Sequence, residues 1–228
     1  MSSVLLVLSG ARVWSLKDGT QHPTGFWADE VTAPHRLLVE AGHDVTIATP
    51  GARIPVVDQA SLSDDESGAE QRAYLESVKD ALESPIRLED VDPATYDAVF
   101  IPGGHGPMQD LAVNPDVARI LAALLPDDTK VVASLCHGPA AFLAAGDAEG
   151  NWLFKGRKLT AFTDEEEKQA GLADNAPWLL EDRLRAGGAI FESAPAWSSH
   201  VVVDGNLITA QNPASAEAAG QAILAKLA

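Results

Sequence analysis

The chain has a single cysteine, Cys136, and the residues around it suit a nucleophile. A lone cysteine is more commonly an inert buried side chain, so its surroundings decide the question. The apolar run 131–135 leads into Cys136, and a segment of helical character follows it. A sharp strand-to-helix turn needs small residues two positions before and after the nucleophile, and these are Ser134 and Gly138. We predict a nucleophile elbow at Cys136, where the positive end of the following helix lowers the pKa of the thiol.

A glycine-rich loop, residues 103–106 with the sequence Gly-Gly-His-Gly, follows a second apolar run at 97–102. Three glycines in four positions indicate that the backbone approaches another group closely, although a tight turn would favour the same residues. The carboxyl ends of parallel strands meet at one edge of a sheet, which brings this loop near Cys136. Its amide N–H groups could then form an oxyanion hole together with the N–H of His137.

Glu30 is a third candidate, because it stands at the start of a helix predicted over residues 29–41. By itself, a glutamate in a first helical turn is an ordinary surface residue that the helix dipole favours. This helix follows the first predicted strand, so Glu30 starts at the same end of the sheet as Cys136. The position makes Glu30 a candidate site residue.

Short apolar runs alternate with amphipathic segments along the first half of the chain, as is typical of α/β proteins. The predicted strands are apolar on both faces, as buried parallel strands are. They cover residues 4–9, 44–49, 97–102 and 130–136. Besides the helix at 29–41, one is predicted at 115–125, after the cap and first-turn pair Asn114-Pro115. These patterns predict a three-layer α/β sandwich with a mainly parallel, doubly wound sheet of the flavodoxin-like type.

The second half of the chain is less regular. Its predicted elements are a strand at 158–163, a short helix at 177–186, a hairpin at 201–209 with an Asp-Gly turn, and a closing helix at 215–227. Residues 51–93 are polar and acidic, and we predict a small insertion there with one helix at about 65–82. The whole chain, 1–228, is predicted to be a single domain that carries this insertion.

The chain is strongly acidic: 16 Lys and Arg residues stand against 33 Asp and Glu, a formal net charge of −17. A polyanion repels phosphate backbones and anionic lipid headgroups, so nucleic-acid and membrane partners are not expected. No apolar run is long enough to span a bilayer, and the start lacks the positive segment of a signal peptide. One cysteine allows neither an intrachain disulfide nor a cysteine-based metal cluster. We therefore expect a cytoplasmic protein.

Six segments, in order along the chain, resemble those of the DJ-1/PfpI superfamily, within the class I glutamine amidotransferase-like fold. More narrowly, the chain is similar to the heat-shock-protein-31 type of glyoxalase III and holding chaperone. The Cys-His-Gly-Pro sequence, the glycine loop and the upstream glutamate carry the superfamily resemblance. The matching segments are residues 25–30, 41–45, 101–106, 133–139, 159–164 and 211–215.

The resemblance implies a Cys-His-acid triad in which Cys136 is the nucleophile and His137 is its partner. The acid is implied a few residues after a Phe-Thr-Asp segment, where Glu165, Glu166 and Glu167 stand. The family spacing favours Glu167. Three successive glutamates near a helix start would otherwise be a solvated run that the helix dipole favours.

The resemblance also implies roles for Glu30 and for a set of binding residues. Glu30 matches the carboxyl group that contacts the cysteine sulfur and exchanges protons with the substrate. A carboxylate beside a thiolate resists ionisation, so Glu30 is expected to be protonated. The residues expected to bind the substrate or its oxyanion are Gly103, Gly104, His105 and Trp27.

The implied activity is that of a glutathione-independent glyoxalase, a lyase of the D-lactate dehydratase type. Cys136 would attack the aldehyde of methylglyoxal or a related 2-oxoaldehyde and give a hemithioacetal. A proton shift and hydrolysis would then yield a 2-hydroxy acid such as lactate, with no metal, glutathione or nucleotide. The implied assembly is a homodimer.

Other functions stay open on the sequence. One is a stress-responsive holding chaperone, or a sensor in which Cys136 is oxidised. A cysteine amidase or peptidase is a weaker alternative, because amidotransferases of this fold carry a His-x-Glu motif near the C-terminus that this tail lacks. The six histidines lack the spacing of metal ligands, so no metal is expected, although His105, glutamates and His200 could meet in space.

Overall fold

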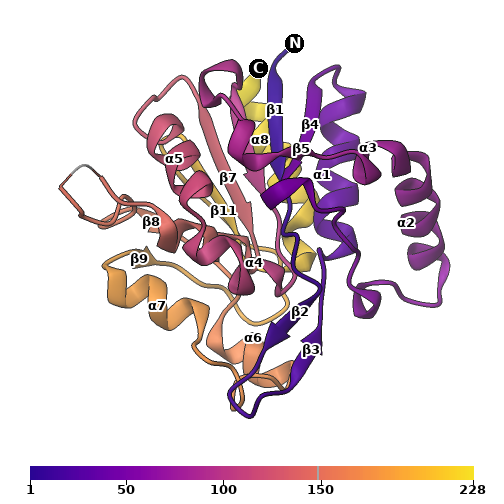
Figure 1. Cartoon of the computed structure of the whole chain (residues 1–228), viewed down its shortest axis with the longest axis vertical. Helices are drawn as coiled ribbons and strands as arrows, with labels where there is room; N and C mark the ends of the chain where they lie inside the picture. The colour runs from indigo at the N-terminus through magenta and orange to yellow at the C-terminus, as the bar shows by residue number, and fades with distance from the viewer. Residues whose placement is uncertain (148) are drawn as a thin grey trace.

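A seven-stranded sheet forms the centre of the computed structural model, which describes residues 1–147 and 149–228 (Figure 1). From one edge to the other, the strands are β10 (Val201–Asp204), β11 (Leu207–Ala210), β7 (Val131–Leu135), β6 (Ala98–Ile101), β1 (Ser3–Val7), β4 (Asp44–Thr49) and β5 (Ile86–Arg87). All neighbouring pairs are parallel except β10 and β11, which form the predicted antiparallel hairpin. The predicted, mainly parallel α/β sheet is therefore confirmed.

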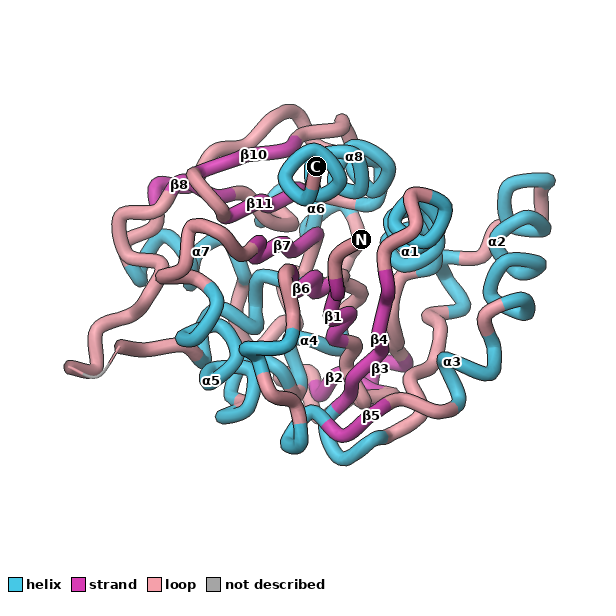
Figure 2. The backbone as a smooth tube through the Cα atoms, turned by 90° about the horizontal axis from the view of Figure 1, so that it is seen from above, coloured by secondary structure: helices cyan, strands magenta, loops and turns pink. Residues whose placement is uncertain are grey.

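Helices cover both faces of this sheet and make three layers (Figure 2). On one face lie α1 (Ala28–Glu40) and α8 (Ala216–Leu227), and on the other lie α4 (Gly106–Gln109) and α5 (Pro115–Leu124). Along β1, Leu5 and Val7 pack with the α5 layer, whereas Leu6 packs with the α1 layer. Both faces of the strand are buried because successive side chains point to opposite sides.

Helix α5 begins at the cap and first-turn pair that the sequence predicted, Asn114-Pro115. The Asn114 side chain accepts hydrogen bonds from the backbone N–H groups of Asp116 and Val117, at 2.9 and 3.0 Å. Pro115 occupies the first helical turn, where a missing N–H costs nothing. This cap fixes where α5 begins, after α4 and a short 3-10 helix at Leu111–Val113.

The strand predicted over residues 158–163 is much shorter in the structure. Only β8 (Lys158–Leu159) forms, and it pairs with β9 (Ile190–Phe191) in a separate two-stranded sheet. The next backbone N–H groups bond elsewhere: that of Thr160 donates to Thr209 Oγ1, and that of Phe162 donates to the carbonyl of Cys136. These bonds tie the segment to the sheet edge beside Cys136 instead of extending a ladder.

The predicted single helix at 65–82 is two helices, α2 (Glu66–Ser77) and α3 (Lys79–Glu83). Val78 separates them with φ −107° and ψ 13°. The Ser77 hydroxyl donates to the Tyr74 carbonyl at 2.6 Å, and such side-chain bonds compete with the helical ladder. The segment 51–93, predicted to be an insertion, also contains β5, the edge strand beside β4.

Three further elements complete the surroundings of the site. They are α6 (Asp164–Gln169), α7 (Leu180–Gly187) and a small hairpin of β2 (Val13–Ser15) with β3 (Gln21–Pro23). Helix α7 begins three residues later than the 177–186 prediction placed it. No helix among the described residues is long and apolar enough to cross a membrane.

Candidate active site

Cys136 directly follows β7 and precedes a 3-10 helix at Gly138–Ala144, in place of the α-helix that the sequence suggested. Its φ of 59° lies in the left-handed region, which is strained for a residue with a side chain. The turn is tight: a Cβ at Gly138 would lie 2.1 Å from the Ile101 carbonyl oxygen. Ser134 Oγ donates to that same oxygen at 2.8 Å. Small residues on both sides of Cys136 are thus a steric requirement.

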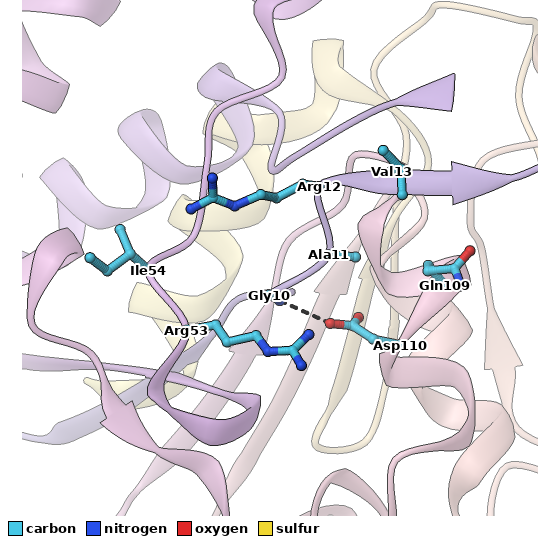
Figure 3. Close-up of a pocket in the computed structure, with 8 residues that line it drawn as sticks. All are labelled: Gly10, Ala11, Arg12, Val13, Arg53, Ile54, Gln109 and Asp110. Carbon is cyan, nitrogen blue, oxygen red and sulfur yellow. Dashed lines mark hydrogen bonds between the residues drawn. The ribbon is translucent and has the colours of Figure 1, made fainter. Parts of the chain in front are cut away.

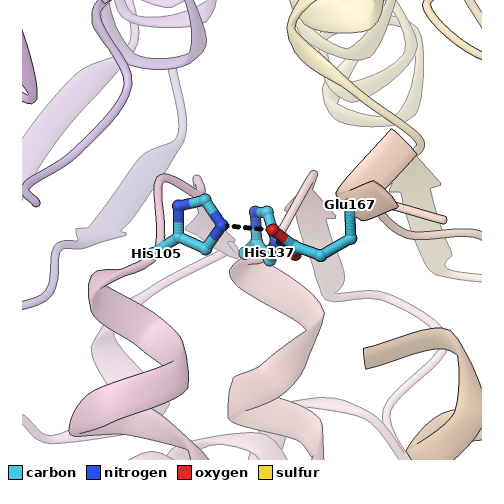
Figure 4. A group of neighbouring side chains, drawn as sticks. All are labelled: His105, His137 and Glu167. Atoms are coloured by element: carbon cyan, nitrogen blue, oxygen red, sulfur yellow. Dashed lines mark hydrogen bonds and ion pairs between the residues drawn. The ribbon is translucent and has the colours of Figure 1, made fainter. Parts of the chain in front are cut away.

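His137 links the thiol to an acid on α6 (Figure 4). Its Nδ1 lies 3.4 Å from Cys136 Sγ, and its Nε2 lies 2.7 Å from Glu167 Oε2. All three side chains are buried. An ionised carboxylate only accepts, so the Nε2–H of His137 donates in this bond and Nδ1 faces the thiol.

Glu167 is held by a second imidazole. His105 Nε2 lies 2.9 Å from Glu167 Oε1, and the His105 ring stacks on Trp14 with centroids 4.8 Å apart. Burial raises the pKa of Glu167, but the adjacent His137 and His105 rings outweigh burial and hold it well below its usual range. Burial and the nearby His137 lower the pKa of His105. The group therefore holds the Glu167 carboxylate between two imidazole rings.

Glu166 and Glu165 have other partners. Glu166 Oε2 accepts from the N–H and hydroxyl of Thr163 at the start of α6, and Thr163 Oγ1 accepts from the Glu166 N–H. This is a capping box, whose Thr-x-x-Glu pattern is visible in the sequence. Glu165 is exposed and accepts from Gln169. Because the cap directs Glu166 back to the N-terminus of α6, the next residue, Glu167, is left for His137.

Glu30 lies in the first turn of α1 with no exposed surface. Its Oε2 accepts from the Gly103 N–H at 2.7 Å, whereas Oε1 has no nitrogen or oxygen partner among the described residues. Burial raises the pKa of Glu30 to about 8, against the effect of hydrogen bonds from Cys136 and Gly103. The carboxyl group is thus protonated over most of the physiological range, as the sequence analysis expected.

The expected lowering of the Cys136 pKa is wrong for the free site. Burial, the Glu30 charge and the hydrogen bond with Glu30 raise the pKa of the thiol, and N–H groups of Gly104 and His137 only partly offset them. The exclusion of water and the carboxyl neighbour outweigh any lowering of the thiol pKa by the helix end. Glu30 and Cys136 titrate as a pair in which only one member readily carries a negative charge.

The glycine loop passes between these groups. A Cβ at Gly103 would lie 2.6 Å from the His137 nitrogen and 2.9 Å from both Cys136 Cβ and Glu30 Oε2. Gly104 has φ 82°, and a Cβ there would lie 2.1 Å from the Gly25 carbonyl oxygen. Only glycine fits at either position. The loop consequently brings its amide groups up to the sulfur, where the predicted oxyanion hole requires them.

A small cavity of about 60 Å³ opens onto this group. Its lining is mostly apolar and comprises Trp27, Gly104, His105, Cys136, His137, Phe162, Ala170, Trp197 and Pro213. A molecule of only a few non-hydrogen atoms fits such a volume, since one water takes about 30 Å³ in the liquid. A larger cavity of about 680 Å³ lies near the end of β1, between Arg12 and Asp110 (Figure 3). None of the predicted site residues lines that larger cavity, so size alone does not find the site.

The structure brings together all the predicted site residues and gives His105 a contact that was not predicted. His105 contacts Glu167 as well as the cavity, whereas the sequence analysis assigned it only to substrate binding. Phe162 and Trp197 were missed. Phe162 lies in a segment that the resemblance already marked, but Trp197 carries no local signal because it reaches the cavity through tertiary packing alone.

A metal could use one set of side chains here. The ligand atoms of His105, His137 and Glu167 lie within 4.8 Å of one another. His200, which the sequence analysis considered as a ligand, is not in this group. Binding a cation would replace the bond between His137 and Glu167, so a metal at this place competes with the Cys-His-Glu arrangement.

The chain is thus a mainly parallel α/β sandwich that carries a buried Cys-His-Glu group beyond the end of β7. Sequence comparison is consistent with this architecture, since residues 23–226 match the DJ-1/PfpI family. The chain belongs to the DJ-1/PfpI family.

Its relatives include enzymes. Glyoxalase 3 of Candida albicans is 29% identical over 235 residues, covering 99% of this chain and 98% of that protein. The solved structure of glyoxalase III from the same organism superposes with a TM-score of 0.85 at 28% identity, covering 99% and 97% of the two chains. Protein/nucleic acid deglycase HchA of Staphylococcus aureus is 29% identical over 96% of this chain and 77% of its own length.

Proposed function

We propose that this protein is a glutathione-independent glyoxalase that converts methylglyoxal or a related small 2-oxoaldehyde to a 2-hydroxy acid. One observation carries the proposal: Cys136 and His137 line one small cavity, Glu167 bonds to His137, and the buried acid Glu30 hydrogen-bonds with Cys136. Similarity to glyoxalase 3 over nearly the full length of both chains supports it. The roles of the residues below are part of the proposal.

Cys136 supplies the nucleophile. The thiol proton passes to His137 Nδ1, which Glu167 keeps free by accepting from Nε2. The thiolate adds to the aldehyde carbon, forming the C–S bond and moving the carbonyl electrons onto oxygen. The N–H groups of Gly104 and His137, which already face the sulfur, stabilise that oxyanion until it is protonated to the hemithioacetal.

An internal oxidation and reduction follows. The proton on C1 is removed and a proton is delivered to C2, by way of an enediol, with Glu30 or His137 as the carrier. The carbonyl at C2 becomes the hydroxyl, and C1 becomes a thioester of Cys136. Water then hydrolyses the thioester, which releases the 2-hydroxy acid and restores the thiol. The only co-reactant is water, so the reaction needs no external oxidant.

Substrate size and charge support a small neutral molecule. The cavity holds only a few non-hydrogen atoms, and its wall is mostly apolar apart from the reacting groups. The relative HchA is named for nucleic acids as well as proteins, but a net charge of −17 disfavours a polyanionic substrate. We therefore propose a free 2-oxoaldehyde as the substrate, with D-lactate the expected product from methylglyoxal.

The test is lactate formation from methylglyoxal in the absence of glutathione. Wild-type protein should produce lactate, and Cys136→Ser should produce none above the uncatalysed background. Suppression of client-protein aggregation is measured on the same samples, because a holding activity does not need the thiol. Equal lactate from both proteins, or none from either, would refute the glyoxalase proposal.

A further inference from the structure

Trp197 forms part of the wall of the Cys136 cavity, although it is 61 positions from Cys136 in sequence (197 − 136). Its ring packs edge-on against Phe162 at a centroid distance of 5.5 Å, and the Phe162 ring lies 4.4 Å from that of His137. Trp197 is also 45% exposed, so the side chain reaches from the cavity wall to the surface. The two aromatic rings thus make a wall that extends from the surface to the triad histidine.

The backbone of Trp197 is strained. Its φ is 63°, in the left-handed region that a bulky side chain rarely adopts. The Trp197 N–H donates to Glu166 Oε1 at 2.9 Å, and the indole Nε1–H donates to Gln169 Oε1 at 2.6 Å. Strain of this kind persists only where surrounding contacts impose it, and it concentrates at functional sites.

Buried side chains hydrogen-bond to the backbone of the segment that carries Trp197. Asn212 Nδ2 donates to the Ser198 carbonyl at 2.8 Å and to Glu166 Oε1 at the same distance. Gln211 bonds both the N–H and the carbonyl of Ala194. Glu166, Gln211 and Asn212 have no exposed surface. Buried side chains therefore hold the backbone on both sides of Trp197, and the ring forms a rigid wall.

We propose that Trp197 determines the size of the molecules that reach Cys136. The cavity of about 60 Å³ has this partly exposed ring in its wall, and the buried anchors prevent the ring from retreating with its backbone. As a statement about substrates, the proposal rests on the glyoxalase function. As a statement about access to the thiol, it stands without that function.

The access test uses Cys136 as its own reporter, because it is the only cysteine in the chain. Rates of alkylation by iodoacetamide and by the bulkier N-phenylmaleimide are measured for wild type, Trp197→Gly and Trp197→Phe. Glycine accepts the left-handed φ without strain and keeps the N–H bond to Glu166, so the fold is retained. Trp178→Gly is the matched control, since Trp178 lines a different cavity with Arg183.

Trp197→Gly should raise the N-phenylmaleimide rate relative to the iodoacetamide rate by about tenfold or more, the scale on which pocket contacts discriminate. The same ratio of rates for Trp197→Phe should lie between those of Trp197→Gly and wild type. The ratio for Trp178→Gly should match that of wild type. A ratio unchanged in Trp197→Gly, or an equal change in Trp178→Gly, would overturn the proposal.

The substrate test compares methylglyoxal with phenylglyoxal in the same four proteins. Trp197→Gly should shift kcat/KM toward phenylglyoxal by about tenfold, mostly through KM, because the ring limits binding and not the chemical steps. If wild type turns over neither compound, the glyoxalase function fails while the alkylation ratio still decides the role of Trp197. If wild type turns over both compounds and Trp197→Gly leaves the ratio of their kcat/KM values unchanged, the size limit is contradicted and the glyoxalase function is not.

Discussion

Glu165, Glu166 and Glu167 are consecutive, yet their carboxylates lie in three different environments. The first is exposed, the second caps α6 and anchors the Trp197 segment, and the third lies between two imidazoles. Charge and residue type are identical, so any difference between their variants reports position alone. This makes the three glutamates an internal set of controls.

Glu167→Gln should lower kcat for methylglyoxal by about 100-fold or more, because an amide does not stabilise the His137 imidazolium as a carboxylate does. Glu165→Gln, which changes the same group on the solvent side, should leave kcat unchanged. Both are measured as initial rates of lactate formation, with the thermal midpoint recorded for each protein. Equal rates for the two variants would remove Glu167 from the proposed triad.

Glu30 gives the fold a defined dependence on pH. Its pKa is about 8 in the folded protein, and 4.5 is the ordinary value, so between these limits unfolding releases a proton. The contribution of Glu30 to stability therefore falls as pH rises from 4.5 to 8 and is constant outside that window. Glu30→Gln lacks this decline, and its unfolding free energy should gain on wild type as pH increases.

Urea unfolding at pH 5 and pH 8 measures that gain. The difference between Glu30→Gln and wild type isolates this carboxyl group, because all other titrating groups are common to both proteins. A difference that stays constant across the two pH values would mean that Glu30 is ionised in the folded state.

At the scale of elements, the turn between β7 and the 3-10 helix depends on Gly138. A Cβ there would lie 2.1 Å from the Ile101 carbonyl oxygen, a contact with backbone that no rotamer change relieves. Gly138→Ala should cost about 3 kcal/mol of unfolding free energy, at the upper end of the usual range for overpacking. The measurement is chemical unfolding.

Gly146→Ala is the matched control for that prediction. Gly146 is exposed, and the nearest neighbour of an added Cβ would be the Asn151 carbonyl oxygen at 3.5 Å, an ordinary contact. This variant should unfold close to the wild-type midpoint. Similar losses in both variants would show that the cost does not come from the contact with the Ile101 carbonyl oxygen.

Much of the element order could be predicted, since buried parallel strands and helix caps are local patterns. The Cys136 turn could be predicted too, because its steric needs act on Ser134 and Gly138 nearby in sequence. Resemblance supplied Glu167, although the Thr-x-x-Glu cap that directs Glu166 away was present in the sequence. The prediction of a strand over residues 158–163 was wrong, because the backbone there bonds to Thr209 and Cys136, which lie far away in sequence.

Properties that arise only on packing could not be predicted. The direction of the Cys136 pKa was wrong because burial and the approach of Glu30 depend on how α1 packs on the sheet. The contact of His105 with Glu167 joins residues 62 positions apart. Trp197 enters the site for the same kind of reason. Local patterns therefore identified the reacting groups but not the environment that tunes them.

At the scale of the whole molecule, the net charge of −17 makes the folded state repel itself. Raising the ionic strength from 0.01 to 0.1 M shortens the screening length from about 30 to about 10 Å. The urea midpoint of unfolding should therefore rise with added sodium chloride over this range. A midpoint that falls would indicate that attractive ion pairs dominate the electrostatics of the fold.

The central claim is that one thiol per chain performs the chemistry, and partial alkylation tests it most directly. Iodoacetamide is added in steps, and the fraction of Cys136 modified is measured by mass spectrometry alongside the rate of lactate formation from methylglyoxal. Because Cys136 is the only cysteine, the rate should fall in a straight line and reach zero at one label per chain. Lactate formation that persists when Cys136 is fully modified would contradict the account.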